Sequence, residues 1–204
     1  MKQSAPMEDV EFQGLVCKLV RQRQWDTAHA GSDRSRLYSQ NYSSCSAFAG
    51  IDPENGWAFL CDFDTFCSVN AIDDLAEELE RLGTDFNKFE LHTASSYWWP
   101  RTYLVSSLVS WFIPGPFFWF VLASAMVLSS TRLYLLWKIW RLRGNKSLPK
   151  HHGSFLRRRF QIMVDADTQE IVAQRYSGKG AAGDFSAPKW WLFKAQKAGI
   201  ELAH

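Results

Sequence analysis

Four cysteines and five histidines are the side chains in this sequence best suited to nucleophilic or metal chemistry. They are Cys17, Cys45, Cys61, Cys67, His29, His92, His151, His152 and His204. No CxxC pair and no CxxC…HxxxH spacing occurs, so the sequence predicts neither a zinc site nor a cofactor. Asp62 and Asp64 offer two carboxylates to a cation, but no third or fourth ligand accompanies them. A thiol acts as a nucleophile only where a base or a cation lies beside it.

The segments that would position these side chains form an α+β pattern. Strands are predicted at 10–20, 45–51, 57–63 and 89–93, with a later hairpin made of 160–164 and 170–176. Asn55-Gly56 indicates a turn between the second and third of these strands. Residues 21–44 are rich in Ser, Arg, Asp and Asn and predict a loop.

One helix is predicted over residues 70–83. Leucines at 75, 79 and 82 form one apolar stripe, Ser68 or Asn70 is available as a cap, and Gly83 ends the helix. Cys17, Cys61 and Cys67 fall on or beside these elements and are predicted to be small core residues. His29, His151 and His152 are placed in loops without an assigned partner.

A long uncharged segment interrupts the α+β pattern. Thr102–Thr131 holds 30 consecutive residues without a charge, and Pro114-Gly115-Pro116 divides it. It predicts a helical hairpin that dips into a membrane, with the second arm extending through 133–140. A single span over about 117–140 and a buried pair of core helices are the alternatives. The first fifteen residues lack the apolar core of a signal peptide, so the hairpin, which keeps both ends in the cytosol, is favoured.

The flanks of this segment support the same interpretation. Trp98, Trp99, Trp137 and Trp140 stand where interfacial anchors of a membrane protein stand. Residues 141–159 hold seven basic side chains and no acid, and they are predicted to meet lipid headgroups on the cytoplasmic face. These basic residues are Arg141, Arg143, Lys146, Lys150, Arg157, Arg158 and Arg159.

Composition sets the outer limits of the interpretation. The chain has 204 residues, 47% of them hydrophobic, which excludes a disordered or collagen-like protein. Its mean hydropathy of −0.23 excludes a polytopic membrane protein. Residues 1–100 carry 8 basic and 16 acidic side chains, and the remainder carries 15 and 5. The acidic first half disfavours a nucleic acid as partner and leaves a protein partner open, while the oligomeric state is not predicted.

The order of these elements resembles the CheD-type deamidase superfamily, which includes the N-terminal asparagine amidohydrolases. The resemblance lies in the CSAFAGI strand, the DPENG turn, the WAFLCDF strand, the helix, the FELHT strand and the FQIMVDADTQEIVAQ hairpin. It covers roughly 37–95 and 158–176, about 40% of the chain. It implies a cysteine-hydrolase-type sandwich, here interrupted by the membrane hairpin.

The same resemblance implies the site residues. In that family a Cys thiolate attacks a carboxamide, and a His on the paired strand acts as base. Cys45 matches the nucleophile, Ser39 matches the upstream group that orients the base, and Asp62 stands where the His belongs. The Gly that usually precedes the nucleophile is absent, and Thr93-Ala94-Ser95-Ser96 replaces the "VGG" that follows the last of these strands in the family.

Loss of the His has a chemical cost. A carboxylate of pKa about 3.9 is a poor base for a thiol of about 8.5, a mismatch of about 6 kcal/mol. A nearby negative charge also raises the pKa of a thiol. His92 is the candidate to replace the base, although active members of the family also carry a His at that point, where it is a strand residue.

Three functions follow from these observations. The first is a membrane-tethered, catalytically degenerate CheD-like domain that binds a partner or regulates it at the cytoplasmic face. The second is an active membrane-bound thiol amidohydrolase that deamidates Gln or Asn with Cys45. The third is a membrane-remodelling hairpin with a regulatory soluble part. The chain is expected to divide into five parts. Residues 1–36 form an N-terminal part and 37–97 the first part of the domain. The membrane hairpin at 98–142 and a basic linker at 143–159 follow, and 160–204 hold the closing hairpin and the tail.

Overall fold

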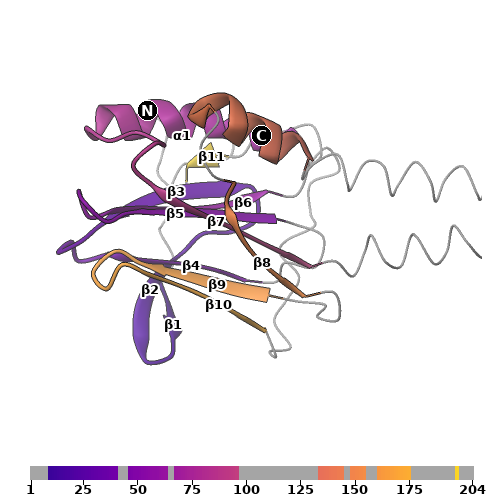
Figure 1. Ribbon diagram of the computed structural model, residues 1–204. Helices are drawn as coiled ribbons and strands as arrows, with labels where there is room; N and C mark the ends of the chain where they lie inside the picture. Colours follow the sequence, from indigo (N-terminus) through magenta and orange to yellow (C-terminus); the bar gives the residue numbers. More distant parts are fainter. Residues whose placement is uncertain are drawn as a thin grey trace, which may run out of the picture.

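The computed structural model describes residues 9–40, 46–63, 67–96, 133–144, 148–154, 160–175 and 196–197. Over these residues two β-sheets lie face to face, and two helical segments cover the far side of one sheet (Figure 1). The architecture is therefore α+β in three layers, with strands as the major component. The α+β pattern expected from the sequence is confirmed.

The five-stranded sheet has the order β1-β2-β4-β9-β10. Its strands are β1 (Asp9–Phe12), β2 (Leu15–Leu19), β4 (Arg36–Gln40), β9 (Phe160–Asp165) and β10 (Glu170–Arg175). β9 and β10 form the later hairpin predicted from the sequence, with Asp165 opposite Glu170. β4 pairs with β9, which brings the first and last thirds of the chain into one sheet.

The six-stranded sheet has the order β11-β3-β6-β5-β7-β8. Its strands are β3 (Gln24–His29), β5 (Ser46–Asp52), β6 (Trp57–Phe63), β7 (Glu90–Ser96), β8 (Lys150–Ser154) and β11 (Gln196–Lys197). β5 and β6 form the predicted hairpin, and Gly56 supplies the positive φ of 68° in its turn.

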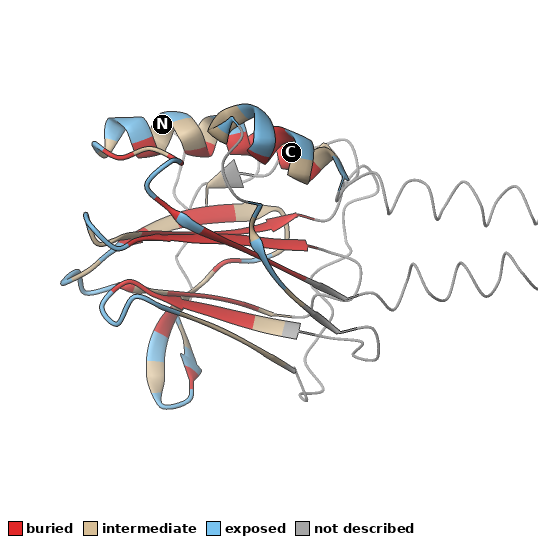
Figure 2. Cartoon of the chain, in the orientation of Figure 1, coloured by how far each residue is buried: buried red, intermediate tan, exposed pale blue. Residues whose placement is uncertain are grey.

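The two faces of the six-stranded sheet bury different side chains. The inner face, toward the other sheet, carries alanines at 28, 47, 49, 58 and 94, which pack with Ile162 and Val164. The outer face carries Phe48, Phe59 and Phe63, which pack under the helices. Figure 2 shows the buried residues concentrated on these central strands. The small inner side chains let the two sheets approach, and the large outer ones fill the space beneath the helices.

The helical layer consists of α1 (Ala71–Arg81), preceded by η1 (Ser68–Asn70), and of helical residues 133–143. α1 confirms the predicted helix, and Gly83 follows it with φ 81°. Asn70 stands at the N-cap position of α1, as predicted, but its side chain makes no cap hydrogen bond. Instead its Oδ1 accepts a hydrogen bond from the Tyr134 hydroxyl at 2.7 Å.

One strand prediction and one loop prediction near the N-terminus are wrong. Residues 10–20 form a hairpin, β1–β2, because Gln13 and Gly14 adopt positive φ angles and reverse the chain. The loop predicted over 21–44 contains strands β3 and β4. These strands are rich in polar residues, which is typical of a loop. Their side chains nevertheless alternate with a period of two, and this alternation buries Ala28 and Leu37 between the sheets.

The predicted membrane hairpin is contradicted. Among the described residues, no helix is long and apolar enough to cross a membrane. The second arm, expected to continue through 133–140, packs on the sheet: Leu135 and Ile139 join its core cluster and Lys138 pairs with Asp73. The prediction of a membrane-bound protein with cytoplasmic soluble parts rested on this hairpin and is contradicted with it. The segment 102–131 lies outside the described residues, as do Trp98 and Trp99.

Candidate functional site

Ser39 and Asp62 lie opposite one another between the two sheets. Ser39 is on β4 and Asp62 on β6, and their side chains are 1% and 2% exposed. The Ser39 hydroxyl donates a hydrogen bond to Asp62 Oδ2 at 3.2 Å. The backbone oxygen of Asp62 accepts a further bond from the Arg23 amide at 2.9 Å. Two of the residues that the family resemblance assigns to the site are thus in direct contact.

A second polar contact joins the sheets beside the first. Lys18 on β2 forms an ion pair with Asp26 on β3. Asp26 and Asp62 share the inner face of the six-stranded sheet, two residues out of register on neighbouring strands. Burial raises the pKa of Asp26, and the Lys18 ammonium opposes that shift. This end of the interior therefore holds two carboxylates and one ammonium among alanines.

Neither Lys18 nor Asp26 was singled out from the sequence. The signal was available in the strand QWDTAH, where period two places Asp26 on the same face as the buried Ala28. A charged residue at an inward position needs a partner, and Lys18 provides it.

Neither Cys17 nor Cys61 carries an activated thiol. Cys17 and Cys61 are buried, 1% and 0% exposed, as predicted for core residues, whereas Cys67 is only partly buried. Burial raises the pKa of Cys61 well above its usual value, with Asp62 and Asp26 adding to the shift. Burial also raises the pKa of Cys17. Cys45 lies outside the described residues; β5 begins at the next residue, Ser46.

His92 lies away from the Ser39–Asp62 contact. In the sheet it is opposite Ala49, whereas Asp62 is opposite Ala47 on the other side of β5. Two strand spacings and a register shift of two residues separate the Cα atoms of His92 and Asp62 by about 12 Å. The structure therefore does not bring His92 to Asp62.

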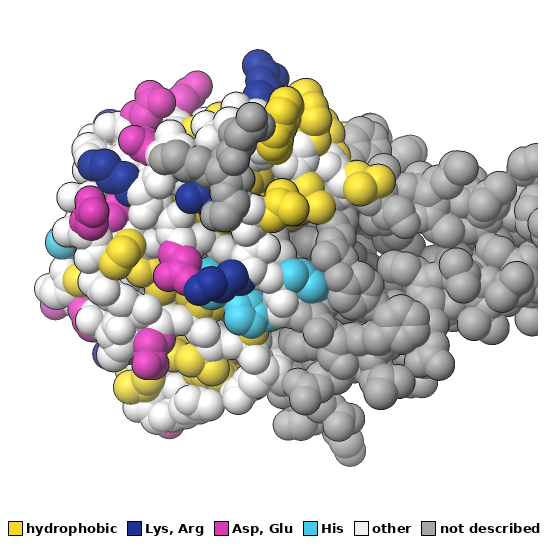
Figure 3. Space-filling view, in the orientation of Figure 1, with side chains coloured by type: hydrophobic (Ala, Val, Ile, Leu, Met, Phe, Trp, Pro, Cys, Tyr) yellow, Lys and Arg dark blue, Asp and Glu magenta, His cyan; other side chains and the backbone are white. Residues whose placement is uncertain are grey.

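His92 has a different partner, His152 on β8. His92 Nδ1 is 2.6 Å from His152 Nε2, and the rings stack with centroids 4.9 Å apart. Glu90 lies 3.6 Å from His92 Nε2 and forms an ion pair with Lys150. Figure 3 shows histidine, basic and acidic side chains together on this surface. The loop prediction for His151 and His152 is wrong, since β8 pairs in parallel with β7.

Burial governs the titration of the histidine pair. It lowers the pKa of His92, and the neighbouring His152 lowers it further. Burial and then Lys150 lower the pKa of His152. The pair is therefore held neutral at pH 7 and is a weaker proton acceptor than a free imidazole.

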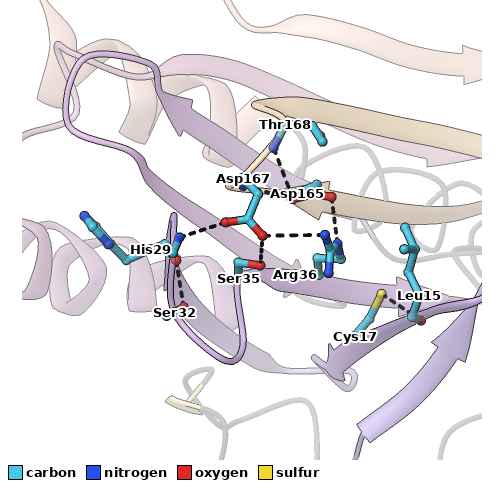
Figure 4. Close-up of polar contacts among 10 residues, drawn as sticks. Leu15, Cys17, His29, Ser32, Ser35, Arg36, Asp165, Asp167 and Thr168 are labelled. Carbon is cyan, nitrogen blue, oxygen red and sulfur yellow. Dashed lines mark hydrogen bonds and ion pairs between the residues drawn. The ribbon is translucent and has the colours of Figure 1, made fainter.

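A further polar cluster lies at the turn between β9 and β10 (Figure 4). Arg36 Nε donates to Asp165 Oδ2 at 2.7 Å, and the Ser35 hydroxyl donates to Asp167 Oδ2 at 2.5 Å. The amide of Gly31 donates to Asp167 Oδ1 at 2.8 Å. Asp165 Oδ1 accepts the amides of Asp167 and Thr168. Because these carboxylates accept hydrogen bonds from the turn and from residues beside it, the cluster stabilises the β9–β10 hairpin.

The basic residues assigned to lipid headgroups have partners within the chain where they are described. Arg143 donates to the Phe89 carbonyl at 3.1 Å, and Lys150 pairs with Glu90. The guanidinium of Arg141 lies 5.8 Å from the centroid of the Trp137 ring. Lys146 and Arg157, Arg158 and Arg159 lie outside the described residues.

Comparison with known proteins gives no family for the chain. No family model matches it, and no curated protein matches it significantly. Within the part of the chain that the structure describes, no group of three or more His, Cys, Asp or Glu side chains is arranged to hold a metal ion.

Proposed function

We propose that this chain is a catalytically inactive, CheD-like domain that acts by binding a protein partner and regulating it. The observation that supports this proposal most is the buried Ser39–Asp62 hydrogen bond. In the resemblance, Asp62 stands where an imidazole base would stand and Ser39 where the residue that orients it would stand. Here the orienting hydroxyl donates to a carboxylate instead.

The chemistry of the site supports inactivity. A carboxylate that accepts a hydrogen bond between two sheets is a weak base toward a thiol. Its negative charge also favours the protonated thiol, the reverse of what a nucleophile needs. The nearby ammonium of Lys18 is paired with Asp26 and is not available to offset that charge.

An active thiol amidohydrolase that uses His92 as base is the alternative, and two observations disfavour it. His92 is one strand removed from β6, and its Nδ1 is engaged with His152. To take the place of the base at Asp62, the His92 side chain would have to leave His152 and reach across β5, past Ala47 or Ala49.

The alkylation rate of Cys45 with iodoacetamide, measured against pH, separates the two functions. Cys17 and Cys61 are buried, so a Cys67→Ser background isolates the Cys45 signal. We expect an apparent pKa of about 8.5 or higher, that of an unactivated thiol. A value well below 7 would contradict the proposal and favour the amidohydrolase.

A second experiment tests whether the missing imidazole is the cause. Asp62→His restores the residue of the active pattern, and Asp62→Asn is the matched control that removes only the charge. Ammonia release from Gln and Asn peptides is the measurement. We expect no ammonia release from the unmodified chain or from Asp62→Asn. We also expect Cys45→Ala to bind the protein partner as the unmodified chain does. Ammonia release by the unmodified chain that Cys45→Ser abolishes would overturn the proposal.

A further inference from the structure

The ion pair between Lys18 and Asp26 crosses the interior from one sheet to the other. Lys18 lies on β2 beside Leu37 of β4, and Asp26 lies on β3 opposite Leu60 of β6. Both leucines belong to the core cluster between the sheets. The side chains of Lys18 and Asp26 are 12% and 1% exposed. An ammonium and a carboxylate are therefore held in contact where water has little access.

The charged form of this pair is costly to keep in such an interior. Both ions lose most of their hydration between the sheets, and their mutual attraction offsets that cost only in part. Burial raises the pKa of Asp26 although the Lys18 ammonium opposes the shift. Transfer of one proton from Lys18 Nζ to Asp26 gives an amine and a carboxylic acid, both uncharged. An amine and a carboxylic acid in contact are the reactants of amide formation.

A second carboxylate, that of Asp62, lies beside the pair. Asp26 and Asp62 are diagonal neighbours on β3 and β6, and the Cα atoms of such neighbours are about 7–8 Å apart. Burial and then Asp62 and Asp26 raise the pKa of Cys61, so both carboxylates lie around the same thiol. The Ser39 hydroxyl, which donates to Asp62 Oδ2 at 3.2 Å, fixes the second carboxylate in place. This carboxylate is placed to exchange a proton with the pair, directly or through one water molecule.

We propose that Lys18 and Asp26 join in an intramolecular amide bond, with Asp62 as the proton carrier. The Lys18 amine attacks Asp26 Cγ, and a C–N bond forms. Asp62 accepts a proton from that nitrogen and donates it to the hydroxyl group on Cγ. The C–O bond then breaks and one water molecule leaves. One ammonium and one carboxylate thus become one amide and one water, and the step needs no further reactant.

The interior of the sandwich favours this condensation in two ways. Groups held in an attacking position react as if their effective concentration were about 10⁵–10⁸ M, and here two packed strands hold them. A neutral amide also costs less to bury than two ions. The product would link β2 to β3 and so tie the two sheets together at this end. This inference goes beyond the proposed function and holds whether or not Cys45 is active.

Mass spectrometry of the intact, unfolded chain tests the bond without any substitution. We expect most molecules to be lighter than the sequence requires by the mass of one water molecule. Trypsin cleaves after Arg21 and Arg23, yet residues 3–21 should stay joined to residues 24–34 in one branched peptide. The full sequence mass in every molecule, after the folded chain has been kept at pH 7, would overturn the proposal. Loss of water without the branched peptide would also overturn it, because a cyclic imide of an aspartate has the same mass.

Two substitutions test the residues assigned to the reaction. Lys18→Arg keeps the positive charge but removes the nucleophilic amine, so this variant should have its full sequence mass. Asp62→Asn should lower the fraction of bonded molecules at least tenfold after the same time, because an amide does not carry the proton. Glu77→Gln is the matched control, since Glu77 is an exposed acid on α1 and the bond should form as in the unmodified chain. Equal bonding in Asp62→Asn would overturn the assignment of Asp62 as proton carrier.

Discussion

The two faces of the six-stranded sheet show how differently one set of strands can be used. The outer face is built from large aromatic side chains under the helices, with Phe59 in contact with Phe48, Phe86 and Phe89. The inner face combines alanines with the buried charges Asp26 and Asp62. Packing alone accounts for the outer face. The inner face keeps polar groups that packing does not require, and this is where the candidate site lies.

Removal of one outer-face ring should have the largest effect on stability. Phe59→Ala takes away a fully buried side chain and its three aromatic contacts, so we expect a loss of about 3–5 kcal/mol in the free energy of unfolding. Urea denaturation followed by far-UV circular dichroism measures it. A matched deletion on the inner face, Ala58→Gly, should cost far less. A loss below about 1 kcal/mol for Phe59→Ala would show that the helical layer does not rely on this face.

Removal of one partner from the inner-face ion pair should have the next largest effect. Lys18→Met leaves Asp26 buried without its ammonium, which costs about 3 kcal/mol at pH 7. Burial already raises the pKa of Asp26, and an acid with a raised folded-state pKa favours folding most when it is protonated. The loss in Lys18→Met should therefore shrink as the pH falls toward 4.

The double variant Lys18→Met/Asp26→Leu checks the cause of that loss. If the penalty comes from an unpaired buried carboxylate, replacing both partners by apolar groups should recover most of the stability at pH 7. A double variant as unstable as Lys18→Met would instead indicate that the pair is needed for the approach of the two sheets. Thermal unfolding at pH 7 and pH 4 distinguishes these results.

The same contrast explains what the sequence could predict. Alternation and turn residues correctly predicted β5, β6 and the β9–β10 hairpin, and the leucine spacing predicted α1, because each signal is local. The strands β3 and β4 were missed because their buried positions include Asp26 and Ser39, whose partners come from distant parts of the chain. The contact of Ser39 with Asp62 has no local signal, since no local pattern joins residues 23 positions apart.

The prediction of a membrane hairpin is an error of the opposite kind, because a local pattern was present but its interpretation was wrong. The second arm of the membrane hairpin is predicted to extend through 133–140, which includes Lys138, whereas Lys138 lies inside the fold with Asp73. Trp137 and Trp140 are exposed as interfacial residues would be, but on a helix that packs on the sheet. The sequence alone does not distinguish a helix that faces lipid from one that faces its own domain.

The histidine pair offers a smaller, pH-dependent test at the other edge of this sheet. Burial lowers the pKa of both His92 and His152, so their contribution to stability is full above about pH 6.5 and is lost as the pH falls below it. His152→Gln should cost about 1 kcal/mol at pH 7.5 and less at pH 5, because the histidines of the unmodified chain are then being protonated. A stability difference that does not change between these two pH values would contradict the shared contact.

The smallest effect is expected at the hydrogen bond between Tyr134 on the helix 133–143 and Asn70 beside α1. Tyr134→Phe removes the hydroxyl that donates to Asn70 but keeps the ring on Trp137, so the free energy of unfolding should fall by about 1 kcal/mol. Asn70→Ala should cost a similar amount, and the two together little more than either alone, because they break the same bond. Additive losses would mean that Tyr134 and Asn70 each stabilise the fold through contacts of their own rather than through the bond that joins them.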